Sequence, residues 1–160
     1  MAMLRLRPLQ LDDLDLVCRH REEMFREAGR PDDLLDEMRE PFRRWLEPRL
    51  AQSEYFGFVA ELAGEPIGGI GLMTIEWPPH PAHPLDARRG YVLNLFVEPE
   101  HRGRGVARAL MAASDDAFAR QALSYAILHA TEAGKPLYER IGWAATTEMG
   151  KPLKADGAGT

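Results

Sequence analysis

Two glycines and two arginines follow closely on a strongly apolar stretch of this chain. The segment after Val97 reads Glu-Pro-Glu-His and continues as Arg102-Gly103-Arg104-Gly105-Val106-Ala107. Glycine has no side chain, so a ligand can approach its backbone closely. A helix that begins here presents unpaired N–H groups and a partial positive charge, to which the arginines add. These residues predict a loop that holds a diphosphate group.

Two other phosphate-binding loops match this segment poorly. A Walker A loop requires a glycine, four residues, glycine-lysine and a serine or threonine, and the chain contains no such string. A dinucleotide-binding fingerprint requires a third glycine where this chain has Arg108, and it also lacks the expected acidic residue about 20 positions later. Gly103 and Gly105 could also do no more than shape a tight turn, but such a turn does not require two arginines.

The diphosphate loop needs a strand before it and a helix after it, and the hydropathy pattern predicts both. Residues 91–97 are almost continuously apolar, which is typical of a central strand covered on both faces. A helix is expected from about Gly105 to Arg120, and residues 124–130 read as another apolar strand. Because one helix connects these two strands, the crossover rule makes them parallel.

The N-terminal half predicts a strand, two helices and a hairpin. Residues 4–7 form a short alternating strand, and Asp12 or Asp13 would cap the helix that follows. Its apolar-face positions recur at helical spacing: Leu14, Val17, Cys18, Arg21, Met24, Phe25 and Ala28. A second helix starts near residues 32–33, and Pro41 inside it predicts a kink or two shorter helices. Residues 55–62 and 67–76 predict an antiparallel hairpin with its turn at residues 63–66.

The C-terminal part predicts a short helix and a last strand. Residues 77–84 carry too many prolines for a regular element, so we expect a loop there. Residues 135–140 predict a helix that Gly142 caps, and residues 143–149 could form a final strand. We expect one domain over residues 1–150 and a flexible tail over residues 151–160.

The bulk composition excludes several classes of protein. A net charge of -5 argues against a nucleic-acid partner, because such partners select basic faces. No apolar run approaches the roughly 20 residues that a membrane span needs. Cys18 is the single cysteine and no signal-like stretch opens the chain, so a cytoplasmic location fits best. The histidines have no metal-ligand spacing, so we expect no metal.

The glycine segment is similar to the Arg/Gln-x-x-Gly-x-Gly/Ala motif of the GCN5-related N-acetyltransferase superfamily. The run Pro-Leu-Tyr-Glu-Arg-Ile-Gly-Trp at residues 136–143 resembles the family as well. In all, residues 55–149 resemble it in the order and spacing of elements, and the N-terminal strand and helices take the family's acceptor-binding position. The resemblance implies a mixed sheet of six to seven strands, splayed central parallel strands and about four helices.

The resemblance also implies an activity and a cofactor site. The chain would move an acetyl group from acetyl-CoA to a primary amine of a small molecule or peptide, directly within a ternary complex. Residues 102–107 would hold the pyrophosphate of coenzyme A. Leu95, Phe96 and Val97 would offer backbone groups to the pantetheine arm and an N–H group to the oxyanion. Thr131 stands where many relatives have an asparagine, and its hydroxyl could also bond the pantetheine.

Two residues are candidates for catalysis. Tyr138 falls where the family commonly has a tyrosine that protonates the departing thiolate; alternatively, it only packs on the coenzyme or the core. The strand at residues 91–97 contains no acid, although some relatives have a glutamate there. Asn94 is the one side chain in it that could orient a water or substrate, or it is a buried structural asparagine. Glu22, Glu23 and Glu76 are other candidate bases.

Two alternatives to an active enzyme remain. The chain could be a non-catalytic acyl-CoA-binding sensor that keeps the pyrophosphate loop, or a structural α/β domain with an accidental loop. Tyr138 favours activity, whereas the missing strand acid weakly opposes it. The acidic surface lightly favours cationic acceptors such as polyamines or aminoglycosides, although overall charge says little about a cleft. Dimers are common among relatives, and a homodimer is compatible with the sequence.

Overall fold

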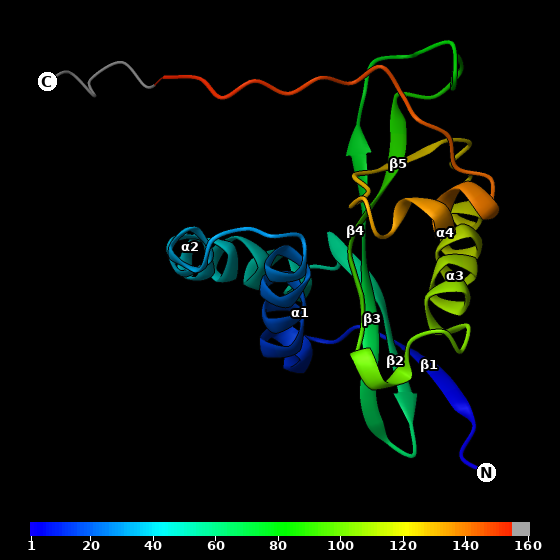
Figure 1. The fold of residues 1–160 in the computed structure, drawn as a ribbon. Coiled ribbons are helices and arrows are strands. Elements are labelled where there is room, and N and C mark those ends of the chain that lie inside the picture. Colours follow the sequence, from blue (N-terminus) through cyan, green and yellow to red (C-terminus); the bar gives the residue numbers. More distant parts are fainter. Residues whose placement is uncertain (155–160) are drawn as a thin grey trace, which may run out of the picture.

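A five-stranded sheet with helices on both faces forms the body of the computed structural model, which describes residues 1–154 (Figure 1). The strands are β1 (Leu4–Pro8), β2 (Tyr55–Leu62), β3 (Glu65–Glu76), β4 (Arg88–Val97) and β5 (Ala126–Leu128). The helices are α1 (Leu14–Glu27), α2 (Asp32–Ala51), α3 (Val106–Arg120) and α4 (Lys135–Arg140), with short 3-10 turns at Leu11–Asp13 and Pro99–His101. The strands lie in sequence order and are antiparallel except for the pair β4–β5. The antiparallel β2–β3 hairpin and the parallel β4–β5 pair are both as predicted.

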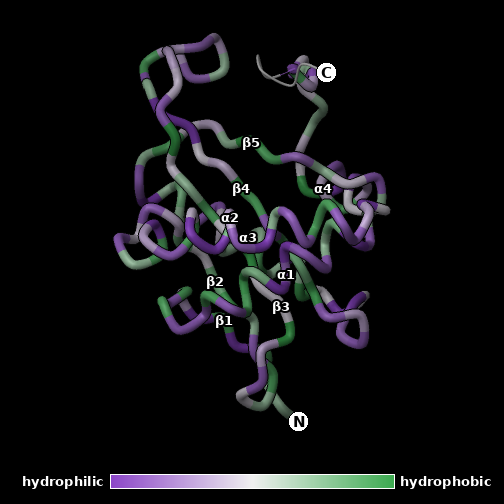
Figure 2. The backbone as a smooth tube through the Cα atoms, turned by 90° about the vertical axis from the view of Figure 1, so that its left-hand side faces the viewer, coloured by the Kyte–Doolittle hydropathy of each residue, from purple (hydrophilic) through white to green (hydrophobic). Residues whose placement is uncertain are grey.

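Each face of the sheet buries its own hydrophobic cluster. Helices α1 and α2 cover one face, and α3 and α4 cover the other (Figure 1). The α1/α2 cluster contains Val17, Leu46 and Tyr55, while Leu110 and Met111 of α3 belong to the other cluster. Figure 2 views the molecule from the α1/α2 side, where green hydrophobic segments follow the strands and purple polar segments alternate along the helices.

The two N-terminal helices differ in detail from the sequence prediction. Asp13 takes the N-cap position of α1, but its carboxylate accepts hydrogen bonds from Arg7 and from the Gln10 N–H instead of capping that helix. Helix α2 is continuous over its 20 residues, so the alternative of two shorter helices is wrong. Pro41 lies on the exposed side of α2, where the carbonyl that loses its N–H partner can bond water.

The β2–β3 hairpin is tighter than its sequence predicts. Strand β3 begins at Glu65, so only Ala63 and Gly64 form the turn. Both have positive φ values, 52° and 82°, which is the conformation of a two-residue turn matched to the strand twist. Pro66 is therefore the second residue of β3 and not part of the turn.

Strand β4 separates from β5 halfway along its length. The parallel pairing covers Gly90 to Val92 of β4, and β4 then continues through residues 93–97 without β5. The register against β3 shifts at the same point, because Gly71 faces Leu93 whereas Gly69 faces Phe96. The extra residue is a β-bulge, and Asn94 within it has a positive φ of 56°. Bulge and separation together give the splayed central strands that the family resemblance implies.

The described part of the sheet has five strands, not six to seven. Residues 143–149 lie without strand partners, so the predicted last strand is wrong. A strand needs a neighbour for its N–H and C=O groups, and no described strand pairs with this segment, although the Glu148 carboxylate lies 3.7 Å from His129 Nε2. The predicted tail over residues 151–160 is described as far as Lys154, in exposed chain without regular structure, and residues 155–160 lie outside the described residues.

Candidate active site

The loop between β4 and α3 leaves a set of backbone donors unused. Within residues 1–154, the N–H groups of residues 103–107 have no hydrogen-bond acceptor. No side chain caps α3, and its first turn contains no acid. Gly103 and Gly105 have φ values of 71° and 82°, and a Cβ atom at either position would meet nothing within 4 Å. Glycine is thus required by the backbone conformation, and the space in front of these donors is open to a ligand.

The two arginines of the loop have different surroundings. Arg102 donates from Nε to the Val97 carbonyl oxygen at 2.8 Å and from Nη2 to the Glu27 carboxylate at 2.7 Å. It therefore ties the loop to the end of β4 and to α1. Arg104 is exposed and makes no ion pair with any residue of the described chain. Its charge remains available to a bound anion.

Tyr138 is held in place by the end of α4. The Trp143 N–H donates to the Tyr138 carbonyl at 2.9 Å, and the Gly142 N–H donates to the Glu139 carbonyl at 3.3 Å. With Gly142 at a φ of 98°, this is a Schellman cap, so the predicted role of Gly142 is confirmed. The rings of Tyr138 and Trp143 lie 6.3 Å apart, edge to face. Burial raises the pKa of Tyr138, so the phenol is protonated at neutral pH.

Thr131 shapes the turn that leads into α4. Its hydroxyl oxygen accepts the Gly134 N–H at 3.1 Å, and its carbonyl accepts the Lys135 N–H at 3.0 Å. The hydroxyl proton has no acceptor within residues 1–154. Thr131 can therefore still donate one hydrogen bond.

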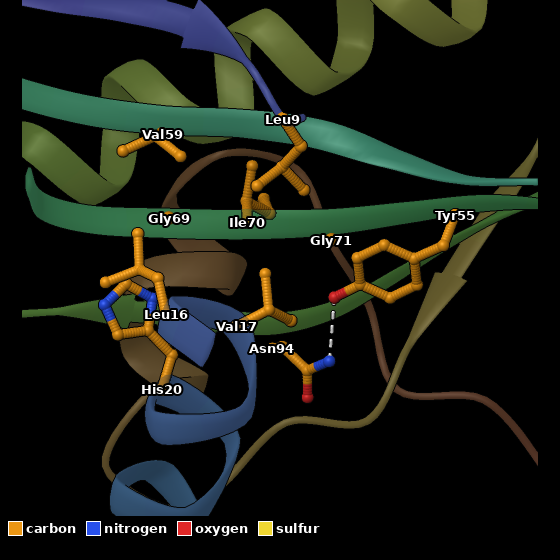
Figure 3. Close-up of a pocket in the computed structure, with 10 residues that line it drawn as sticks. All are labelled: Leu9, Leu16, Val17, His20, Tyr55, Val59, Gly69, Ile70, Gly71 and Asn94. Carbon is orange, nitrogen blue, oxygen red and sulfur yellow. Dashed lines mark hydrogen bonds between the residues drawn. The ribbon is translucent and has the colours of Figure 1, made fainter. Parts of the chain in front are cut away.

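Asn94 lies in the bulge of β4 with both ends of its amide occupied. Its Oδ1 accepts from Arg21 Nη1 at 2.8 Å, and its Nδ2 donates to the Tyr55 hydroxyl at 2.8 Å (Figure 3). The side chain is 4% exposed. This geometry favours the structural reading of Asn94. Neither partner was predicted from the sequence, although Arg21 lies on the apolar stripe of its helix, an unusual place for a charge.

The acidic residues near the α1/α2 face are already paired. Glu22 accepts from Arg39, and Glu23 accepts from Arg26. Glu98, just beyond β4, pairs with Arg19. Strand β4 itself contains no acidic residue, so it places no carboxylate at the point where it separates from β5. The described residues also contain no cluster of three or more His, Cys, Asp or Glu side chains that could hold a metal.

A small cavity lies between α1 and the sheet. Its volume is about 10 Å³, and its lining includes His20, Tyr55 and Asn94 (Figure 3). That volume is at the lower limit for one water molecule, so the cavity excludes an acyl group or an amine substrate. A wider hollow of about 460 Å³ is lined by Thr74 and Gln121, at the end of α3 away from the glycine loop.

His20 is buried in a way that makes folding depend on pH. The side chain is 2% exposed, and its Nε2 has no hydrogen-bond partner within residues 1–154. Burial, with a smaller effect of Arg19, lowers the pKa of His20 to about 4, against a weak opposing effect of Glu98. The unfolded chain therefore binds a proton at a higher pH than the folded chain, and stability is lost as the pH falls from about 6.5 to about 4.

We expect the free energy of unfolding to be about 2 kcal/mol lower at pH 5 than at pH 7.5 because of His20 alone. Urea titrations at the two pH values measure this difference. The variant His20→Gln removes the titrating group and is the control, so the difference between the two proteins isolates His20. An equal loss of stability in both proteins would contradict the assignment.

Comparisons with known proteins agree with this geometry. Residues 16–143 match the family model described as the acetyltransferase (GNAT) family. A crystal structure of a GCN5-related N-acetyltransferase from Ralstonia eutropha JMP134 is 59% identical with a TM-score of 0.93, over 94% of this chain and 99% of that chain. No curated protein sequence matches the chain.

More distant structures share the fold. A predicted acetyltransferase with acetyl-CoA from Clostridium acetobutylicum is 24% identical with a TM-score of 0.81, over 94% of this chain and 96% of that chain. An aminoglycoside N-acetyltransferase in complex with CoA is 18% identical with a TM-score of 0.70, over 96% of each chain. None of the helices in residues 1–154 is long and apolar enough to cross a membrane. The family model spans most of the chain, and the fold and the glycine loop agree with it: this protein belongs to the GNAT family of acetyltransferases.

Proposed function

We propose that residues 1–150 form one domain that transfers an acetyl group from acetyl-CoA to a primary amine of a small molecule or peptide. The observation that carries this proposal is the row of N–H groups at residues 103–107 that have no acceptor in residues 1–154; this row includes the left-handed Gly103 and Gly105 and opens α3. Such a helix start binds diphosphate, and the exposed charge of Arg104 adds to it. The acetyl-CoA and CoA complexes of proteins with a similar fold support this choice of donor.

The acyl arm is proposed to lie in the gap between β4 and β5. Strand β4 continues through Leu95, Phe96 and Val97 after its pairing with β5 ends, so its backbone groups on that side can pair with the pantetheine. An N–H group of this stretch would stabilise the oxyanion of the reacting thioester. The free hydroxyl proton of Thr131 is proposed as a further donor to the arm.

The transfer is proposed to be direct. The amine nitrogen attacks the thioester carbon, a C–N bond forms, and the C–S bond breaks. Tyr138 gives its phenolic proton to the departing sulfur and regains one from solvent. Because β4 offers no carboxylate, the amine loses its proton to water. No covalent enzyme intermediate is needed, since both substrates are held together in one complex.

Two measurements test the proposal. Coenzyme A at 100 times its Kd should stabilise the fold by about 2.7 kcal/mol and raise Tm by about 5–10 °C. Pantetheine lacks the diphosphate and is the control ligand, so it should raise Tm far less. Thiol release from acetyl-CoA across a panel of amines then measures turnover.

The results separate the alternatives. Coenzyme A binding with thiol release from at least one amine supports the enzyme. Binding without release from any amine would favour an acyl-CoA sensor. A Tm that coenzyme A leaves unchanged would refute both, because the glycine loop would then hold no diphosphate.

A further inference from the structure

Arg21 extends from α1 towards the bulge of β4. Its Nη1 donates to Asn94 Oδ1 at 2.8 Å. Its Cζ lies 4.9 Å from the centroid of the Phe25 ring and 4.5 Å from that of Phe42. Aromatic rings contact the flat faces of a guanidinium and leave its N–H edge to other partners. Arg21 therefore has its faces covered while most of its donors remain unused.

Arg21 has no counter-ion within residues 1–154. Among the described residues, no carboxylate lies within 4 Å of it, and its Nε is buried without a hydrogen-bond partner. Five of the six other arginines of the same two helices have carboxylate partners: Arg19, Arg26, Arg39, Arg43 and Arg44; the sixth, Arg49, donates to the Trp45 carbonyl oxygen. Arg21 differs from those five because it extends towards the sheet and pairs with no carboxylate of residues 1–154.

Two phenols interact with Arg21, and both are neutral at neutral pH. They are the hydroxyls of Tyr55 and Tyr91, and burial raises the pKa of both phenols. Burial lowers the pKa of Arg21, but an arginine stays charged at neutral pH. A half-buried cation without an anionic partner is costly to the fold, and a bound anion would offset that cost.

The position of Arg21 relates it to the proposed transfer site. Its partner Asn94 lies two residues beyond Val92, where β4 and β5 separate. Tyr91 and Asn94 of β4 both lie near the guanidinium, and this is the face that α1 and α2 cover. An anion on Arg21 would thus lie one side chain away from the gap proposed for the acyl arm.

We propose that Arg21 binds a carboxylate of the acceptor, so that the preferred acceptors are small amines that also carry a carboxylate, such as amino acids. This inference rests on the proposed acetyl transfer and narrows its substrate class. A carboxylate matches the forked donors of a guanidinium, which an amide or an alkyl group does not. The net charge of -5 does not oppose the binding of a carboxylate at Arg21, because the local charge of a cleft decides which ligands it attracts.

The test compares matched acceptors that differ at one group. Leucine, leucinamide and isopentylamine, with equivalent sets for other side chains, are assayed for kcat/KM at saturating acetyl-CoA. We expect the amino acid with the best-fitting side chain to exceed its amide by about 10- to 100-fold, as for a hydrogen bond to a charged group. The α-amine of leucinamide is less basic than that of leucine, so a larger fraction of it is neutral and able to attack. A preference for leucine therefore cannot come from the ionisation of the amine.

Variants of Arg21 then assign the preference to this residue. Arg21→Met should bring the ratio of amino acid to amide close to one, and Arg21→Lys should keep part of it. Arg49→Met is the matched control. Like Arg21, Arg49 stacks on an aromatic ring, that of Trp45, and has no carboxylate partner within residues 1–154. Unlike Arg21, it lies at the far end of α2. It should leave the ratio unchanged.

Each outcome decides the inference. Transfer to some amine with a wild-type ratio near one would overturn it and leave acetyl transfer intact. If Arg21→Met does not fold, the wild-type ratio and Arg21→Lys decide. If no amine is acetylated, the proposed function fails, and the carboxylate site is judged by binding. N-acetylleucine, unlike its amide, should then raise the Tm of the wild type more than that of Arg21→Lys. Equal shifts would refute the site.

Discussion

Replacement of Gly105 with valine is expected to raise the Kd of coenzyme A at least about 100-fold. Gly105 precedes α3 with a φ of 82°, and a β-branched residue in that region costs about 1–3 kcal/mol. The backbone would relax towards negative φ and turn the N–H groups of residues 103–107 away from a common ligand. Each hydrogen bond lost to the charged diphosphate weakens binding by about 1.5–3 kcal/mol. A total loss near 3 kcal/mol of binding free energy is therefore conservative, and it corresponds to about 100-fold in Kd. Isothermal titration with coenzyme A measures the change.

Gly64→Val is the matched control for this prediction. Gly64 has the same φ of 82° and equally open space around it, but it lies in the β2–β3 turn. Both variants should lose similar stability, whereas only Gly105→Val should lose coenzyme A affinity. Wild-type affinity in folded Gly105→Val would show that the loop does not hold the diphosphate.

Replacement of Tyr138 with phenylalanine is expected to lower kcat by about 100-fold and to change the Kd of coenzyme A by less than about twofold. A positioned general acid contributes about 10²- to 10⁴-fold, and the ring that packs against Trp143 is kept. Because burial raises the pKa of Tyr138, the acid stays protonated through the neutral range. The wild-type rate should therefore fall only above about pH 10, and this alkaline fall should be absent from the variant.

Tyr125→Phe is the control for the loss of a phenol. Tyr125 packs against His83 and Arg89 on the proline-rich loop side, and it belongs to no proposed step. Its kcat should match that of the wild type. A wild-type kcat in Tyr138→Phe, measured where the chemical step limits the rate, would leave Tyr138 with a packing role only.

Much of the fold was predictable because its signals are local. Turn residues and alternating hydropathy place β2 and β3, and the Gly142 cap ends α4 as expected. Errors occurred where a long-range partner decides the outcome. Residues 143–149 have strand-like composition, but no described neighbour supplies the pairing that a strand needs. Helix α2 runs through Pro41 because packing of Phe42 and Leu46 on the sheet outweighs one lost hydrogen bond.

The candidate site divides in the same way. The glycine loop could be predicted from the sequence, because glycines between a strand and a helix indicate a local backbone conformation that other residues rarely adopt. The pairing of Arg102 with Glu27 joins residues 75 positions apart, and that of Asn94 with Arg21 joins residues 73 apart. No local pattern encodes such partners.

The amino-acid sequence by itself determined the order of strands and helices, the crossover that makes β4 and β5 parallel, and the left-handed glycines that open α3. These follow from backbone preferences and from the period of apolar residues, which act over a few positions. The tertiary structure alone decided that Asn94 is bound on both sides and that Arg102 anchors the loop. It also decided that Arg21 faces the splayed strands with no carboxylate partner in the part of the chain that the structure describes. Those outcomes depend on which side chains come into contact when distant elements pack. Burial then sets how strongly their charges and hydrogen bonds interact.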